Sequence, residues 1–206
     1  MDHAVAQQLL AASAALKRAW ARSLLRIYSL QLSFVDRNVG TPFAVDASPL
    51  APHGPFLFVH LNQNSLLESA VFPSVPAPFP TSFLMNWEFT LLPFLGWNLR
   101  LTGVTIDRNN PAQARKGVDE VVRLMREEGR SFYMSIEGHR SENGALHPYK
   151  NGAAVIAIQS QATIVPVISR GLREALPYGD WRVRPGKVEV IYERSDQTSS
   201  GNMRCF

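Results

Sequence analysis

The strongest chemical signal in this chain is the segment Ser135-Ile136-Glu137-Gly138-His139-Arg140-Ser141. It follows an apolar run at 130–134 that favours a strand, and a polar turn at 142–144 comes after it. A glycine that follows a carboxylate at the end of a strand permits a sharp turn and a close approach of a ligand to the backbone. An arginine supplies a planar fork of donors that fits phosphate or carboxylate. The segment therefore predicts an anion-binding site at the end of a strand.

Apolar runs and amphipathic patterns alternate along the rest of the chain. Short apolar runs between turn residues predict strands, and a long amphipathic pattern with Pro111 at its start and Gly129 at its end predicts a helix. The predicted strands are 30–35, 55–60, 82–86, 104–107, 131–136, 163–169 and 187–192, and the predicted helices are 4–30, 65–72, 111–128 and 149–160. Strands separated by helices indicate an α/β fold, with a single-layer, mostly parallel mixed sheet flanked by helices.

The regions between these elements predict how the chain is divided. The segment 73–80 holds four prolines and should be a loop, as should 41–54. We expect an N-terminal helical segment at 1–36, an α/β domain at 37–194 and a flexible tail at 195–206.

The composition indicates a cytoplasmic protein with a core of ordinary size. The chain has 206 residues, of which 46% are hydrophobic, and a net charge of +4. That charge suits an anionic substrate or a membrane surface and is too small to favour nucleic acid. The single cysteine, Cys205, allows no intrachain disulfide. No apolar run reaches the roughly 18 residues of a spanning helix, so we expect any membrane contact to be peripheral, on the inner face of the membrane.

The predicted helix at 4–30 has one apolar and one basic side. Its apolar residues recur at nearly helical spacing, and three arginines follow one another at every fourth position; they are Leu9, Leu16, Trp20, Leu24 and Ile27, and Arg18, Arg22 and Arg26. The helix could lie on an anionic bilayer, or it could pack on the core with a solvated basic side. The pattern alone leaves both interpretations open.

Four segments, taken in order, resemble the lysophosphatidate (1-acylglycerol-3-phosphate) acyltransferase family. The family carries NHxSxxD, a block ending in Ile-Asp-Arg, FPEGTRS and IVPV. This chain carries Asn62-Gln-Asn-Ser-Leu-Leu-Glu68, Gly103-Val-Thr-Ile-Asp-Arg108, the segment at 135–141 and Thr163-Ile-Val-Pro-Val167. The resemblance runs from about Gly54 to Tyr192.

The resemblance implies a glycerolipid acyltransferase-like fold and membrane-associated work in phospholipid biosynthesis. An acyl group would move from acyl-CoA or acyl carrier protein to a hydroxyl or amine acceptor, such as that of a lysophospholipid. We expect no metal and no cofactor other than this co-substrate, because thioester acyl transfer requires a base and oxyanion donors.

The catalytic block departs from the family pattern at its base. In the family a histidine takes the proton from the substrate hydroxyl, and an aspartate five residues later orients it. Here these positions hold Gln63 and Glu68, and a carboxamide has no usable basicity. His60 and His139 are candidate replacements for the base, and each could instead be a structural or anion-contacting histidine.

The resemblance also implies a set of substrate-binding residues. Arg108 and Arg140 would contact phosphate, and Glu137 would position the glycerol hydroxyls. The full set is Asn62, Ser65, Arg108, Glu137, Gly138, Arg140 and Ser141. The apolar segment 87–97 could form an acyl-chain wall or ordinary core.

A second interpretation of the same segments is a catalytically inactive lipid- or acyl-binding module, with another transfer reaction in the same pocket as a third. These interpretations differ in one observable feature. An active enzyme with an altered base needs a histidine ring within hydrogen-bond reach of the pocket floor near Gln63 and Glu68.

Overall fold

The computed structural model describes residues 3–37, 41–42, 55–61, 65–74, 81–92, 95–138 and 140–193. The predicted site residues Asn62, Gln63 and His139 lie outside the described residues, and so does the predicted tail at 195–206.

Eight strands of the described residues form one sheet, in the order β2-β1-β8-β7-β3-β6-β4-β5. Five neighbouring strands, from β7 to β5, run parallel, while β8 is antiparallel to β7 and β2 is antiparallel to β1. The predicted mostly parallel, mixed sheet is therefore confirmed. The strands are β1 (Leu30–Asp36), β2 (Thr41–Pro42), β3 (Phe56–His60), β4 (Thr81–Asn86), β5 (Val104–Ile106), β6 (Ser131–Ser135), β7 (Thr163–Arg170) and β8 (Gly186–Tyr192).

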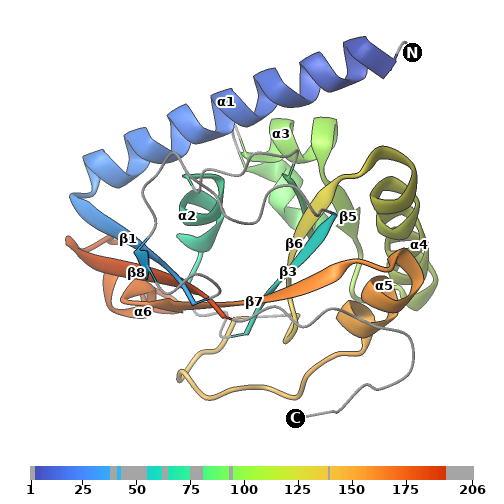
Figure 1. Ribbon diagram of the computed structural model, residues 1–206. Coiled ribbons are helices and arrows are strands. Elements are labelled where there is room, and N and C mark those ends of the chain that lie inside the picture. Colours follow the sequence, from blue (N-terminus) through green and yellow to red (C-terminus); the bar gives the residue numbers. More distant parts are fainter. Residues whose placement is uncertain are drawn as a thin grey trace.

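The helices lie on both sides of this sheet (Figure 1). The long helix α1 crosses one side and packs on α2 and α3, whereas α4 and α5 pack together on the other side. Their bounds are α1 (His3–Ile27), α2 (Glu68–Ser74), α3 (Leu95–Thr102), α4 (Pro111–Glu128), α5 (Gly152–Ser160) and α6 (Leu172–Ala175), and a 3-10 helix, η1, covers Trp87–Leu91. None of these described helices combines the length and the apolar character needed to cross a bilayer.

Strand β3 is buried along its whole length and separates two hydrophobic cores. Phe56 and Phe58 point into the core on the α1 and α2 side, and Leu57 and Val59 point into the core on the α4 and α5 side. Because side chains alternate along a strand, His60 continues the series of Phe56 and Phe58. The ring of His60 therefore lies on the α2 side of the sheet.

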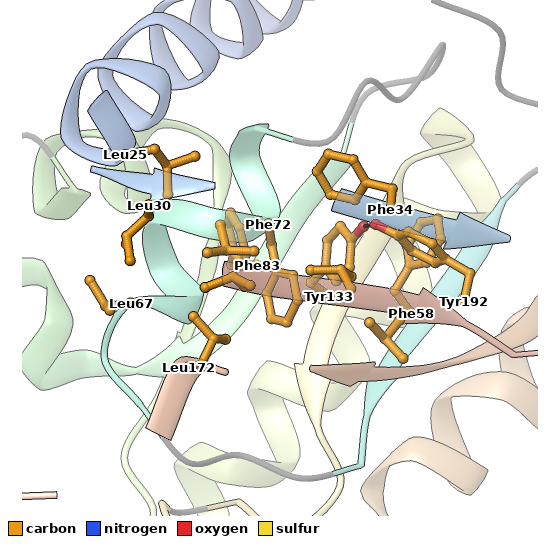
Figure 2. Packing of buried hydrophobic residues seen from close by; sticks show 14 of the residues in the cluster. Leu25, Leu30, Phe34, Phe58, Leu67, Phe72, Phe83, Tyr133, Leu172 and Tyr192 are labelled. Carbon is orange, nitrogen blue, oxygen red and sulfur yellow. Dashed lines mark hydrogen bonds between the residues drawn. The ribbon is translucent and has the colours of Figure 1, made fainter. Parts of the chain in front are cut away.

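Aromatic rings fill the core on the α2 side. The ring of Tyr133 stacks on Phe58 and Phe72, with centroids 4.4 and 5.0 Å away, and its hydroxyl lies 2.9 Å from that of Tyr192 (Figure 2). Burial raises the pKa of the Tyr133 phenol well above its ordinary value, and the hydrogen bond with Tyr192 offsets part of the effect. Tyr133 is therefore a neutral part of the pocket floor described below.

Helix α4 is capped at both ends, and it begins at Pro111 and stops before Gly129 as the sequence predicted. The Asn110 side chain accepts a hydrogen bond from the Gln113 N–H at 3.2 Å, and Gly129 ends the helix with a φ of 63°. Gly117 lets the helix approach β5, since an added Cβ would lie 2.3 Å from the Ile106 side chain. This close packing fixes the β5–α4 loop, which carries Arg108.

The structure differs from the sequence prediction in three described regions. Helix α2 extends to Ser74, two residues into the predicted proline loop, because the backbone of proline has a helical φ and only one donor is lost. The segment 87–97 contains η1 and the start of α3, and α6 follows β7, none of which was predicted. The domain boundary at residue 36 stays a prediction, although β1 lies in the main sheet beside β8.

Candidate active site

A pocket opens at the carboxyl ends of the parallel strands β3, β4 and β6, where α/β sheets bind ligands. It holds about 540 Å³ of space, including its open mouth. Its polar lining consists of His60, Ser65, Glu68, Ser69, Arg108 and Ser135, and its apolar wall of Leu66, Phe72, Phe83, Leu84, Met85, Phe89, Tyr133 and Met134.

His60 and Glu68 form a buried pair in this pocket. The Nδ1 of His60 lies 3.3 Å from Oε2 of Glu68, and the two residues are only 2% and 5% exposed. The other ring nitrogen, Nε2, lies 3.0 Å from Oγ of Ser169 on β7. Phe72 contacts the ring edge to face, with centroids 4.9 Å apart. The pair thus joins the end of β3 to the start of α2, with a titratable ring on one side and a carboxyl group on the other.

Glu68 is held by the residues that begin α2. Its Oε1 accepts the backbone N–H of Ser65 at 3.2 Å, while Oγ of Ser65 accepts the N–H of Leu67 at 3.3 Å. These two bonds resemble a capping box of the form Ser-x-x-Glu, with the Ser65 hydroxyl bonded to the Leu67 N–H in place of the Glu68 N–H. Ser65 Oγ also donates to the Leu176 carbonyl at 3.0 Å. Oε1 of Glu68 is therefore held by the Ser65 N–H at the start of α2. This contact fixes the orientation of the carboxylate, so that Oε2 faces His60.

Arg108 brings positive charge to the same pocket. It follows β5, in a loop where the Asp107 side chain accepts the Asn109 N–H at 2.9 Å. Burial lowers the pKa of the Arg108 guanidinium from its ordinary value, and the nearby Glu88 carboxylate partly offsets this. A guanidinium withdrawn from water and facing a pocket is suited to an anionic ligand group.

Within the segment at 135–141, Glu137 and Gly138 order a loop and do not line the described pocket. Glu137 is fully buried, and its Oε2 accepts the His147 backbone N–H at 2.9 Å. Gly138 has a φ of 78°, and an added Cβ would lie 3.1 Å from the Lys150 side chain. Both residues fix the start of the loop that leads to α5, and Ser135 is the described residue of the segment that lines the pocket.

Arg140 and Ser141 have partners elsewhere in that loop region. The guanidinium of Arg140 lies over the Tyr178 ring, 4.8 Å from its centroid, and Ser141 Oγ donates to Oδ1 of Asn143 at 3.4 Å. The described pocket therefore brings together His60, Ser65, Glu68 and Arg108, and Arg140 is not among the described residues that line it. A role of Arg140 in phosphate binding stays a prediction.

The apolar segment 87–97 contributes one described residue to the pocket. Phe89 lines it, whereas Leu91 and Trp97 are 67% and 60% exposed. The described part of this segment is therefore largely a surface rather than core, and an acyl-chain wall stays a prediction.

Ser169 is the contact that sequence reasoning missed. It occupies the same face of β7 as Val165 and Val167, which are fully buried. A serine in an alternating series of core residues is the available signal, because a buried hydroxyl requires a partner. Its partner could not be identified from the sequence, since β3 and β7 are far apart along the chain.

Comparison with known proteins identifies the family of this chain. Residues 65–170, slightly more than half of the chain, match the family model of the Acyltransferase family. The chain belongs to that family.

Named relatives are glycerolipid acyltransferases. A 1-acyl-sn-glycerol-3-phosphate acyltransferase of Limnanthes douglasii is 36% identical over 135 residues, which are 65% of this chain and 48% of the relative. One from Salmonella typhimurium is 37% identical over 89 residues, 43% of this chain and 36% of the relative. The chain spans about half the length of the first of these relatives.

A solved structure shows the same fold. It is the crystal structure of the 1-acyl-sn-glycerophosphate acyltransferase PlsC from Thermotoga maritima, with a TM-score of 0.71 over 92% of this chain and 71% of that chain. The sequence identity is 18%, so the likeness concerns the fold.

Proposed function

We propose that this protein transfers an acyl group from a thioester, acyl-CoA or acyl carrier protein, to a hydroxyl or amine of a lipid acceptor. Lysophosphatidate is the acceptor that the names of the relatives favour. The observation that carries the proposal is the pair of His60 and Glu68 in one pocket with Arg108. This pair supplies a basic ring and a carboxylate where Gln63 has removed the family's histidine.

The reaction needs a proton acceptor beside the acceptor hydroxyl. His60 takes the hydroxyl proton as the oxygen attacks the thioester carbonyl, and Glu68, whose Oε2 lies 3.3 Å from Nδ1 of the ring, stabilises the imidazolium that forms. The tetrahedral intermediate then collapses, the carbon–sulfur bond breaks, and the leaving thiolate takes the proton from His60. The ring returns to its neutral state, and atoms and charges balance.

Arg108 has a separate role in this proposal. It binds the phosphate of the acceptor, because it is a half-buried cation on the wall of the pocket that holds the pair. Gln63 cannot act as a base, and we assign it a role in binding the substrate or in stabilising the oxyanion. His139 stays an alternative base.

One observation favours a second candidate, a catalytically inactive lipid- or acyl-binding module. The ring of His60 is only 2% exposed, so an acceptor reaches it only by entering the pocket fully. An inactive module would retain the apolar wall and Arg108 and would bind acylated ligands without cleaving them.

Product analysis separates the two functions. The protein is incubated with lysophosphatidate and either acyl-CoA or acyl carrier protein carrying an acyl chain, and lipid products are identified by mass spectrometry. An enzyme produces phosphatidate or another acylated acceptor above the rate without protein. An inactive module produces none.

Restoring the family's histidine and aspartate at positions 63 and 68 makes this test more decisive. If the natural protein is inactive, the double variant Gln63→His, Glu68→Asp restores the family pattern and should gain activity. In an active natural protein the same substitutions should bring little gain, or harm, because Glu68→Asp shortens the side chain whose carboxylate lies 3.3 Å from His60. Activity that appears only in the double variant would contradict the proposed function.

A further inference from the structure

We infer that an apolar surface on η1 and α3 inserts into the outer part of a lipid bilayer, so that the pocket opens beside the membrane. We call it the η1–α3 surface, and it consists of Trp87, Leu91, Leu92, Trp97 and Leu101. The inference goes beyond the proposed function, because contact with a bilayer can be measured without any activity.

Large apolar side chains are gathered on the solvent side of η1 and α3. All five residues of the η1–α3 surface are exposed, and Leu101 is the most exposed of them at 78%. They come from one stretch of the chain, 87–101. Proteins often expose single apolar residues, but several on one surface are typical of a contact with a partner or a membrane.

Helix α3 has apolar side chains on both of its sides. Leu99 is buried and belongs to the core on the α1 and α2 side. Trp97 and Leu101, one helical turn apart, lie on the solvent side. A surface helix normally carries polar residues on the side that faces water. The packing of α3 on the core therefore leaves a second apolar side in contact with solvent.

The two elements that carry this surface are packed on each other. The Gly96 N–H donates to the Leu92 carbonyl at 2.8 Å, and the Gly96 backbone lies against the Thr90 carbonyl, where no side chain would fit. The first turn of α3 is thus joined directly to the end of η1. The η1–α3 surface is therefore a fixed part of the fold.

The η1–α3 surface continues into the pocket. Phe89 lines the pocket, and it lies on η1 between the exposed residues Trp87 and Leu91. Met85, near the end of β4, also lines the pocket. An acyl chain that leaves a bilayer along η1 would stay in contact with apolar side chains on its way to the pocket, which avoids the cost of exposing it to water. This continuity favours a lipid bilayer as the occupant of the surface.

The charges near the surface favour a bilayer that contains anionic lipids. Arg100 is exposed on α3, and α1, which packs on α3, adds the exposed residues Arg22 and Arg26 (Figure 1). Glu88 is the single carboxylate among the described residues of η1 and α3, and it accepts a hydrogen bond from Asn86 Nδ2 at 2.9 Å. Tryptophans and arginines around apolar side chains are typical of proteins that lie on a bilayer.

The test begins with a nitroxide spin label that reports depth in a bilayer. The label is attached to the full-length variant Leu101→Cys, Cys205→Ser, and to Ile158→Cys, Cys205→Ser as the control. Ile158 is also exposed, but it lies on α5, on the other side of the sheet (Figure 1). Vesicles of phosphatidylglycerol and phosphatidylcholine should protect the label at position 101 from a nickel chelate and leave the label at position 158 accessible. A label at position 101 that stays accessible to nickel would overturn the inference.

Charged substitutions in the surface measure its contribution to binding. The double variant Leu91→Asp, Leu101→Asp should lower the partition onto these vesicles at least about tenfold, because two leucines no longer transfer out of water. The partition is measured by sedimentation at high salt, which screens the attraction of the arginines. Ile158→Asp should leave the partition unchanged, and equal losses in the two variants would overturn the inference. Urea unfolding checks that both variants keep the fold.

A second copy of this chain is the alternative occupant of the surface. Sedimentation velocity without lipid measures it. A dimer that the double variant abolishes, in a natural protein that does not bind vesicles, would overturn the inference.

The outcomes separate this inference from the proposed function. Insertion of position 101 in a protein that makes no lipid product would support the inference and contradict the proposed function. If the natural protein acylates lysophosphatidate in vesicles while position 101 stays in water, the inference fails and the proposed function stands.

Discussion

Glu68 serves two partners, and its length suits both. One carboxylate oxygen accepts the Ser65 backbone N–H at 3.2 Å, and the other lies 3.3 Å from His60 Nδ1. The family's aspartate at this position is one methylene shorter. We therefore interpret the change from Asp to Glu as matched to the change of base, because the carboxylate must now cap α2 and also reach a histidine on β3.

Glu68→Gln should separate these two tasks. A carboxamide oxygen can still accept the Ser65 N–H, so the free energy of unfolding should change by no more than about 1 kcal/mol. The negative charge beside His60 is lost, so turnover should fall on the order of 10²-fold. Urea unfolding and thiol release measure the two effects. A large loss of stability without loss of turnover would show that Glu68 is structural only.

Ser65→Ala should act on stability rather than on chemistry. The substitution removes the cap on the Leu67 N–H and the bond to the buried Leu176 carbonyl. The free energy of unfolding should fall by about 1–2 kcal/mol, measured by urea unfolding. Ser69→Ala is a matched control, because the Ser69 hydroxyl bonds to the Leu66 carbonyl on an exposed turn. Equal losses in the two variants would contradict the capping role.

At the scale of the elements, α1 is attached to the sheet by both apolar and polar contacts. Ala21 and Leu25 are buried, whereas Leu16 and Ile27 are 70% and 72% exposed. Lys17 Nζ donates to the Thr81 carbonyl at 3.1 Å. One side of α1 thus packs on the core, as the second sequence interpretation expects, and its exposed apolar residues leave membrane contact as a prediction.

Lys17 gives α1 a pH-dependent contribution to stability. Burial, with the charges of Arg18 and Arg130, lowers the pKa of Lys17 to about 8 from its ordinary value of 10.5. Between these values the unfolded chain binds more protons than the folded one, so the contribution of Lys17 to stability should rise from about pH 8 to about pH 10. Lys17→Met should remove that rise in pH-dependent urea unfolding. An identical pH profile in the variant would contradict the assignment.

The arginine row of α1 should attach the protein to anionic membranes if the membrane interpretation is correct. Each basic residue near such a surface contributes about 1 kcal/mol of attraction. Replacing Arg18, Arg22 and Arg26 with Gln should abolish salt-sensitive sedimentation with phosphatidylglycerol vesicles while the fold, measured by circular dichroism, is kept. If the natural protein ignores these vesicles, α1 is a core element alone.

At the scale of the whole molecule, the sequence predicted the sheet because its strands are short apolar runs between clear turn residues. It did not predict α3, because Pro93 and Gly96 read as helix breakers. In the structure Gly96 permits close packing, since an added Cβ would lie 2.1 Å from the Thr90 carbonyl oxygen. A glycine required by a tertiary contact cannot be distinguished from a helix breaker in one sequence.

The sequence predicted the site only in part, because it does not reveal which distant segments come into contact. Glu68 and Arg108 were candidates because they lie at positions that match the family blocks, and His60 was a candidate because it is a histidine at the end of a predicted strand. The structure brings all three to one pocket. The contact of His60 with Glu68 depends on the turn between β3 and α2, and the contact with Ser169 depends on the pairing of β3 with β7. Neither could be predicted from spacing, because sheet pairing joins distant segments.

The most direct test of the account is acceptor-dependent thiol release from acyl-CoA by His60→Gln. The account predicts a fall in kcat of about 10²–10⁴-fold, the range of a positioned acid–base group. His147→Gln is the matched control and should retain activity, since His147 lies outside the described pocket and binds Glu137 through its backbone N–H. Unchanged turnover in His60→Gln, with its loss in His139→Ala, would contradict the account and identify His139 as the base.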